Sequence, residues 1–264
     1  MELVTSRDGT RIAVWRSGSG GPLLLVHGAT ADHSTTWRLV QPDFEQRFTV
    51  HAMDRRGRGR SGDSDEYALQ REAEDIAAVV EAIGAPVDVI GHSYGALCSL
   101  EAALLTSGMR RLVLYEGVPL RGEDTYSPGI IDQLDDLIAA GDAEAALVGM
   151  YREIVRMSPA EIQVMKSDVD AWAVRLRNVR TMPREARVEQ NYRFASERFT
   201  GMRVPTLLLV GGDSPPGEMT NARAVAAGLP DATVAVLPHQ QHVAMYTAPD
   251  MFVREVEQFL CTAA

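Results

Sequence analysis

Short apolar runs alternate with amphipathic segments over the first 115 residues of the chain. The strand candidates lie at Leu23–Val26, Phe48–Met53, Val87–Ile90 and Arg111–Tyr115. Leu23–Val26 is continuously apolar, which suits a strand that is covered on both faces. Helical spacing of apolar positions follows over about 66–83 and 94–105, and Gly84 stands where a helix commonly ends. This alternation predicts an α/β fold with a mostly parallel sheet and helices on both faces.

The strand pattern is interrupted once, over about 120–203. Two strands, Glu2–Thr5 and Arg11–Arg16, precede the alternating region and are joined by an Asp-Gly turn. The interrupting segment contains several helical patterns separated by proline and glycine, after which strands are predicted at Val204–Val210 and Thr233–Leu237. Helices are expected near 221–228 and 250–260. We therefore predict a core formed by 1–119 and 204–264, with a helical insertion at 120–203.

Composition narrows the class of protein. The chain has 264 residues, 45% of them hydrophobic and 23% charged, which is typical of a globular protein. The net charge of −10 argues against nucleic acid as a general partner. Two cysteines make no disulfide framework, and neither a signal peptide nor an apolar run of membrane-spanning length is visible. We expect a cytoplasmic protein with no membrane partner, and no segment indicates an oligomeric state.

The sequence Gly91-His92-Ser93-Tyr94-Gly95 contains the candidate nucleophile. It follows a predicted buried strand and opens a predicted helix, which is the context of a G-x-S-x-G nucleophile elbow. Glycines flank the serine because a Cβ would collide with the neighbouring backbone in so tight a turn. The N-terminus of the following helix directs N–H groups toward developing negative charge. Ser93 is therefore the predicted nucleophile.

A serine hydroxyl needs a base to accept its proton and an acid to orient that base. Only two histidines follow Ser93, and His239 and His242 both lie after the predicted strand Thr233–Leu237. Asp213 ends the apolar run of the preceding strand and is the predicted acid. Glu116, directly after the strand Arg111–Tyr115, is the alternative acid.

Together these residues resemble the α/β-hydrolase family nearly end to end. Leu25-Val26-His27-Gly28-Ala29 is similar to the family's HG segment, which implies that the N–H groups of Ala29 and Tyr94 form the oxyanion hole. The arginine-rich loop from Asp54 to Ser61 is similar to the family's D-x-R-G-x-G-x-S loop, which implies an architectural role for its arginines.

The resemblance also separates the two histidines. The family's catalytic histidine usually stands seven residues before a proline that begins the last helix, and His242 and Pro249 have this spacing. His239 does not, and it is the reserve candidate for the base. Gln241 stands where the family commonly has glycine.

The insertion at 120–203 corresponds to the family's helical cap after the sixth strand, which implies that it shapes the substrate pocket. Its large apolar side chains are divided between the cap's own core and the pocket lining in a way that the sequence does not resolve. They are Met150, Tyr151, Met157, Trp172, Met182, Tyr192, Phe194 and Phe199. Four arginines recur at helical spacing, namely Arg177, Arg180, Arg184 and Arg187. We expect them on a solvated face, paired with Glu185 and Glu189, with contact to an acidic substrate as the alternative.

The function predicted from the sequence is a serine hydrolase that cleaves a small, apolar carboxylic ester or lactone through an acyl-enzyme. Ser93, Asp213 and His242 are its predicted triad, and it uses neither a metal nor an organic cofactor. One alternative is a C–C bond hydrolase, or a cofactor-free haloperoxidase or perhydrolase, with the same triad. A non-catalytic ligand-binding protein on a hydrolase fold is the alternative of another class.

Overall fold

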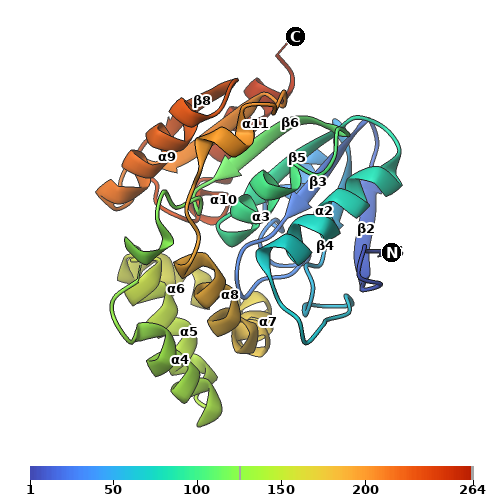
Figure 1. The fold of residues 1–264 in the computed structure, drawn as a ribbon. Coiled ribbons are helices and arrows are strands. Elements are labelled where there is room, and N and C mark those ends of the chain that lie inside the picture. Colours follow the sequence, from blue (N-terminus) through green and yellow to red (C-terminus); the bar gives the residue numbers. More distant parts are fainter. Residues whose placement is uncertain (125, 263–264) are drawn as a thin grey trace.

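The structure is a computed structural model that describes residues 1–124 and 126–262 (Figure 1). One eight-stranded sheet has the order β1-β2-β4-β3-β5-β6-β7-β8. The strands are β1 (Glu2–Thr5), β2 (Arg11–Gly18), β3 (Gly21–Val26), β4 (Phe48–Met53), β5 (Val87–His92), β6 (Met109–Tyr115), β7 (Thr206–Gly211) and β8 (Ala232–Leu237). β1 and β2 pair antiparallel with their neighbours, and the remaining strands pair in parallel. The predicted sheet is therefore confirmed.

Alternate residues of the central strands supply two separate cores. Leu23 and Leu25 of β3 belong to the core on one face, whereas Leu24 and Val26 belong to the core on the other. The helices that cover the first face are α1 (Gln41–Phe44), α10 (Ala244–Thr247) and α11 (Pro249–Leu260). Those that cover the second are α2 (Leu69–Ile83), α3 (Tyr94–Ala102) and α9 (Pro216–Gly228). Burial on both faces explains why β3 consists of consecutive apolar residues.

A group of helices is inserted between β6 and β7 and lies at one end of the molecule (Figure 1). Its α-helices are α4 (Ile130–Ala139), α5 (Ala143–Gly149), α6 (Pro159–Ser167), α7 (Val169–Asn178) and α8 (Met182–Gln190). Shorter helical turns occupy Gly122–Asp124, Met150–Ile154, Val179–Thr181 and Ser196–Phe199. Side-chain caps begin three of the helices, with Asp142 before α5, a Ser158–Glu161 capping box at α6 and Asp168 before α7.

The arginine-rich loop after β4 is built into the interior. The Arg55 guanidinium is fully buried and pairs with Glu72 of α2 and with Glu185 of α8. Arg56 is equally buried and forms a two-pronged pair with Asp75, at 2.7 and 2.8 Å. These pairs tie the loop to α2 and to the inserted helices, in agreement with an architectural role.

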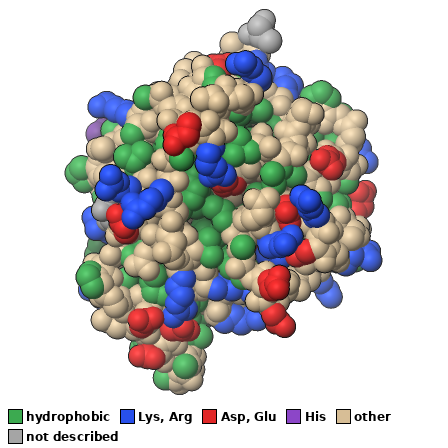
Figure 2. All heavy atoms as spheres, viewed as in Figure 1, with side chains coloured by type: hydrophobic (Ala, Val, Ile, Leu, Met, Phe, Trp, Pro, Cys, Tyr) green, Lys and Arg blue, Asp and Glu red, His purple; other side chains and the backbone are tan. Residues whose placement is uncertain are grey.

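The surface shows no separation of charge on the face in Figure 2, where acidic and basic side chains are interspersed. Within the described ranges, no helix has both the length and the apolar character needed to cross a membrane.

Candidate active site

Ser93 lies on the tight turn between β5 and α3. Its φ of 55° and ψ of −130° are unusual for a residue with a side chain, and such strain is typical of functional sites. A Cβ on Gly91 would lie 2.7 Å from Ala96 Cα, and one on Gly95 would lie 2.7 Å from the Val26 carbonyl oxygen. The turn therefore requires glycine at both positions, as the sequence predicts.

The loop after β6 also approaches the serine closely. Gly117 has a φ of 79°, and a Cβ there would lie 2.5 Å from Ser93 Cα. Glu116, just before it, has a φ of 51°, which an ordinary side chain rarely adopts. This bend directs the Glu116 side chain into the interior, where 2% of it is exposed.

The Glu116 carboxylate contacts His242. Its Oε2 atom lies 2.6 Å from His242 Nδ1. Its Oε1 atom accepts hydrogen bonds from Gly211 N–H at 2.9 Å and from the Ser214 hydroxyl at 2.6 Å. Three donors thus hold the carboxylate in one orientation, and an Nδ1–H···Oε2 bond leaves His242 Nε2 free to accept a proton.

The electrostatic surroundings of His242 favour the imidazolium. Burial by itself lowers the pKa of His242, but the hydrogen bond and charge of Glu116 raise it, as do the charges of Glu218 and Glu161. The net result is a pKa above the usual value. His92 differs, because burial lowers its pKa well below the usual range. Its Nε2 atom lies 2.9 Å from the His242 carbonyl oxygen, so the neutral ring supports the His242 loop by donating to that oxygen.

The expectation that Asp213 orients His242 is not met by the geometry. Asp213 follows Gly211-Gly212 beyond the end of β7, and its side chain is exposed. Its main chain is bonded to the His242 loop through N–H to the Gln240 carbonyl at 2.9 Å, and its carbonyl accepts from Gln241 Nε2 at 2.8 Å. The position that faces His242 is occupied by Glu116, the alternative acid of the sequence analysis.

The reserve base is placed away from these groups. His239 is exposed, with a φ of 60°, in the turn after β8. Gln241, which stands where the family commonly has glycine, is bonded both to the inserted helices and to β6. Its Oε1 atom accepts from the Ser158 N–H at 3.3 Å at the start of α6, and its carbonyl accepts from the Tyr115 hydroxyl. The side chain thus connects the His242 loop with the inserted helices.

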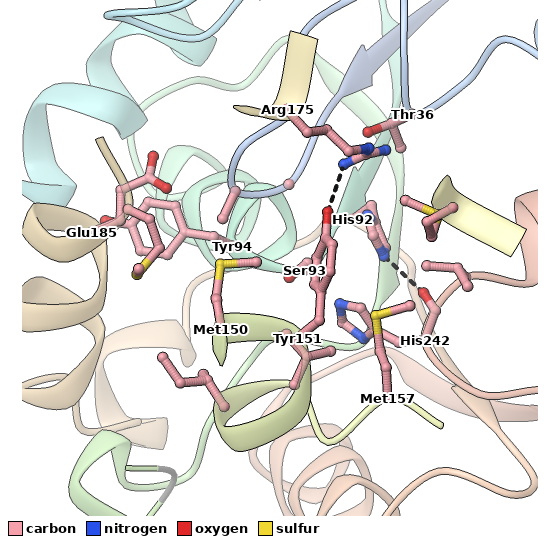
Figure 3. A pocket seen from close by; sticks show the side chains of 18 of the residues that line it. Thr36, His92, Ser93, Tyr94, Met150, Tyr151, Met157, Arg175, Glu185 and His242 are labelled. Carbon is pink, nitrogen blue, oxygen red and sulfur yellow. Dashed lines mark hydrogen bonds between the residues drawn. The ribbon is translucent and has the colours of Figure 1, made fainter. Parts of the chain in front are cut away.

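Ser93, Tyr94 and His242 line one cavity between the sheet edge and the inserted helices (Figure 3). Ala29 lines the same cavity. The cavity has a volume of about 900 Å³ including its open mouth. Tyr94 begins α3, so its N–H has no partner within the helix. No hydrogen bond joins the Ser93 hydroxyl to the imidazole. Such bonds are often long until substrate is bound.

The large apolar residues of the inserted helices fall into two groups, those that line the cavity and those that do not. Four of them line the cavity, namely Met150, Tyr151, Met157 and Met182. The other four pack elsewhere: Trp172, Tyr192, Phe194 and Phe199. The cavity also holds charged groups that the sequence analysis did not assign to it: Arg175, Glu185, Glu189 and Glu218. Arg175 occupies a buried position of α7, at helical spacing from the buried Trp172 and Val179, and this spacing is the signal that could have identified it.

The four arginines at helical spacing, Arg177, Arg180, Arg184 and Arg187, form the arginine stripe, and their predicted pairing with Glu185 and Glu189 is wrong. Glu185 is bonded to Arg55 and Arg58 instead, and Glu189 accepts from the Tyr126 hydroxyl at 2.9 Å. Arg184 pairs with Asp63, and Arg187 pairs with Asp132 and Asp135. Arg177 and Arg180 are exposed. The stripe thus lies outside the cavity.

One group of side chains has the spacing of metal ligands. Ligand atoms of Asp32, His33 and Asp54 lie within 4.8 Å of one another. Their oxygens are used internally, because Asp54 accepts from the N–H and Nδ1 of His33 and from Arg60 N–H. Asp32 accepts from the N–H and hydroxyl of Ser34. These hydrogen bonds account for the cluster, which stabilises the loop that follows β3.

Comparisons with known proteins agree with this architecture. The model of the Alpha/beta hydrolase family matches residues 23–255. A solved α/β hydrolase from Sphaerobacter thermophilus is 33% identical, with a TM-score of 0.85 over 98% of this chain and 100% of that chain. An esterase from Rhodococcus sp. ECU1013 has the same fold, with 21% identity and a TM-score of 0.79 over 100% of this chain and 99% of that one. The 2-hydroxy-6-oxo-6-(2'-aminophenyl)hexa-2,4-dienoic acid hydrolase of Metapseudomonas resinovorans is 24% identical over 100% of this chain and 92% of its own length.

Proposed function

Because the chain belongs to the alpha/beta hydrolase family, we propose that it is a serine hydrolase that cleaves a carboxylic ester or lactone. The observation that carries the proposal is the 2.6 Å contact between His242 Nδ1 and buried Glu116 Oε2, in the cavity that Ser93 also lines. A nucleophile, a base and an acid that orients the base are the groups that acyl transfer requires.

In the proposed first half-reaction, Ser93 Oγ attacks the substrate carbonyl and passes its proton to His242 Nε2. Glu116 keeps the Nδ1 proton in place and stabilises the imidazolium. The carbonyl oxygen becomes an oxyanion, which the N–H groups of Ala29 and Tyr94 stabilise. The C–O bond of the ester then breaks, and His242 returns the proton to the leaving alkoxide. The products of this half are an alcohol and an acyl-enzyme at Ser93.

The second half-reaction repeats the same steps with water as the nucleophile. His242 removes a proton from water as its oxygen attacks the acyl carbon. Collapse of the second oxyanion releases the carboxylic acid, and the proton returns to Ser93 Oγ. The two halves together add one water across the ester bond and use no cofactor.

A C–C bond hydrolase with the same three residues is the second candidate. It is favoured by similarity to the Metapseudomonas resinovorans protein, whose name describes a 6-oxo-dienoic acid substrate. The proposed residues serve both reactions, because water attack on a ketone and on an ester passes through a similar oxyanion. The groups that bind the rest of the substrate distinguish the two.

The proposal is tested with 4-nitrophenyl esters from acetyl to decanoyl, combined with a fluorophosphonate that phosphonylates activated serines with loss of fluoride. We expect release of 4-nitrophenol and a single covalent adduct on the Ser93 peptide by mass spectrometry, with inhibition proportional to labelling. Adduct formation without ester turnover favours the C–C hydrolase. Absence of both contradicts the proposal and favours a ligand-binding protein.

We expect kcat/KM to fall on the acidic side with a midpoint above pH 6.5. The base must be neutral to accept the serine proton, and Glu116, Glu218 and Glu161 raise the pKa of His242 above 6.5. Activity is therefore lost as the pH falls through this raised pKa. The check is the kcat/KM profile for an uncharged ester between pH 5 and 9, with the fold monitored by circular dichroism. A midpoint below pH 6 in folded protein contradicts this assignment.

A further inference from the structure

Arg175 places a buried positive charge in the wall of the proposed catalytic cavity. It lies on α7, and 5% of the residue is exposed. Its Nη1 and Nη2 atoms each lie 3.4 Å from a tyrosine hydroxyl, those of Tyr151 and Tyr246. Its Nε–H has no acceptor. Among residues 1–124 and 126–262, no carboxylate forms an ion pair with this guanidinium.

Other arginines buried in the described part of the chain have strong acceptors. Arg55 and Arg58 share Glu185, and Arg56 pairs with Asp75 and Asp8. The Arg111 guanidinium donates to main-chain carbonyls at the C-terminal end of α11 and beyond it. A buried charge without such a partner is costly, so Arg175 differs from the rest in needing an acceptor from outside the fold.

A second unsatisfied donor faces the same space. Thr36 lines the cavity, is 2% exposed, and its hydroxyl has no hydrogen-bond partner. Figure 3 shows the Thr36 and Arg175 side chains directed into the same end of the cavity, on the side of His92. The Tyr246 hydroxyl donates to the Thr35 carbonyl at 2.5 Å, so toward Arg175 it acts as an acceptor and holds the guanidinium in position. This end of the cavity therefore contains two hydrogen-bond donors, Arg175 Nε–H and the Thr36 hydroxyl, that have no acceptor among the described residues.

The acidic groups of the cavity do not supply that acceptor. Glu185 is neutralised by Arg55 and Arg58. Burial raises the pKa of Glu189 and of Glu218 to about 7, so both are partly protonated near neutral pH. The guanidinium of Arg175 is thus the strongest charge that the cavity offers to a ligand.

Resting on the proposed hydrolase function, we propose that Arg175 and Thr36 bind a carboxylate of the substrate, which makes the substrate an ester of a short dicarboxylic acid. Arginine donors match the two oxygens of a carboxylate in geometry and in charge. The subsite lies close to the reacting carbonyl, because the Tyr151 hydroxyl that contacts Arg175 is 3.4 Å from Thr30 Oγ1, and Thr30 adjoins Ala29. The proposed acidic substrate differs from the small, apolar one that the sequence predicts.

The kinetic test compares 4-nitrophenyl hydrogen adipate with 4-nitrophenyl methyl adipate. The two esters have the same six-carbon acyl chain and differ only in whether the distal carboxyl group is free or methylated. We expect wild type to prefer the acid at least tenfold in kcat/KM. Arg175→Gln should lower kcat/KM for the acid about 30-fold more than for the methyl ester, and Arg175→Lys should restore part of the preference. Arg177→Gln is the matched control, because it removes an exposed arginine of the same helix and should keep the wild-type preference.

A binding test separates this proposal from the proposed catalysis. Calorimetry on Ser93→Ala protein should show that monomethyl adipate, which keeps one carboxylate, binds at least tenfold more tightly than dimethyl adipate, which has none, and Arg175→Gln in that background should remove the difference. Discrimination in binding without ester turnover supports the subsite and rejects the ester hydrolase. Equal binding, or equal losses on both esters in Arg175→Gln, overturns the subsite. Where Arg175→Gln does not fold, Thr36→Val serves instead, with an expected loss of about fivefold in preference.

Discussion

Replacing Ser93 with alanine is expected to lower kcat for 4-nitrophenyl esters by about 10⁵-fold. The substitution removes the Oγ atom that forms the acyl-enzyme, while the proposed donors of Ala29 and Tyr94 stay in place. Those donors and the binding cavity retain a residual acceleration over water. The measurement is steady-state turnover corrected for spontaneous hydrolysis, with protein purified separately from the wild type to exclude contamination.

Ser99→Ala is the matched control for this loss. Ser99 lies on α3, and its hydroxyl donates to the Gly95 carbonyl at 2.7 Å without lining the cavity. Ser99 lies close to the same turn, and its substitution also removes a serine Oγ atom, so we expect a change in kcat of less than about threefold. Retention of more than a tenth of wild-type kcat by folded Ser93→Ala contradicts the role of Ser93 as nucleophile.

The fold could be predicted because local pattern and tertiary environment agree along the core. β4 begins and ends at Phe48 and Met53, as predicted, and all six of its residues are buried. Helix boundaries were less predictable. α9 begins at Pro216, five residues before the predicted start near 221, because proline is well tolerated in the first turn of a helix.

The choice between Glu116 and Asp213 could not be made from the sequence. Both follow neighbouring parallel strands, β6 and β7, so both were expected at the same edge of the sheet. The structure separates them by main-chain direction. The positive φ of Glu116 directs its side chain inward, and the Gly211-Gly212 segment carries Asp213 outward. Glycine adjoins both bends in the sequence, but it does not by itself specify the direction of the acidic side chain.

Arg175 shows a different limit of sequence analysis. Basic residues recur at helical spacing from Arg177 to Arg187, yet those side chains lie outside the cavity. Arg175 interrupts an apolar helical pattern, and a charge in such a position has a reason to be buried. Arg175, a single charge in an apolar pattern, therefore indicated the cavity better than the repeated arginines of the stripe.

Glu116→Gln is expected to lower kcat by about 10³- to 10⁴-fold, whereas Asp213→Asn should change it by less than about threefold. In Glu116, Oε1 accepts from Gly211 N–H and from the Ser214 hydroxyl. A glutamine amide oxygen takes that place, so its NH₂ group faces His242 Nδ1. The imidazole must then present a lone pair at Nδ1 and carry its proton on Nε2, where it cannot accept the proton of Ser93.

Asp213→Asn is a matched control because it makes the same change of carboxylate to amide on an exposed side chain that adjoins the same loop. Thermal unfolding and fluorophosphonate labelling distinguish a tautomer defect from misfolding. Glu116→Gln should unfold near the wild-type temperature and label Ser93 far more slowly. A Glu116→Gln enzyme within threefold of wild type, together with a 100-fold loss in Asp213→Asn, would return the acid role to Asp213 and require a different arrangement of the His242 loop during turnover.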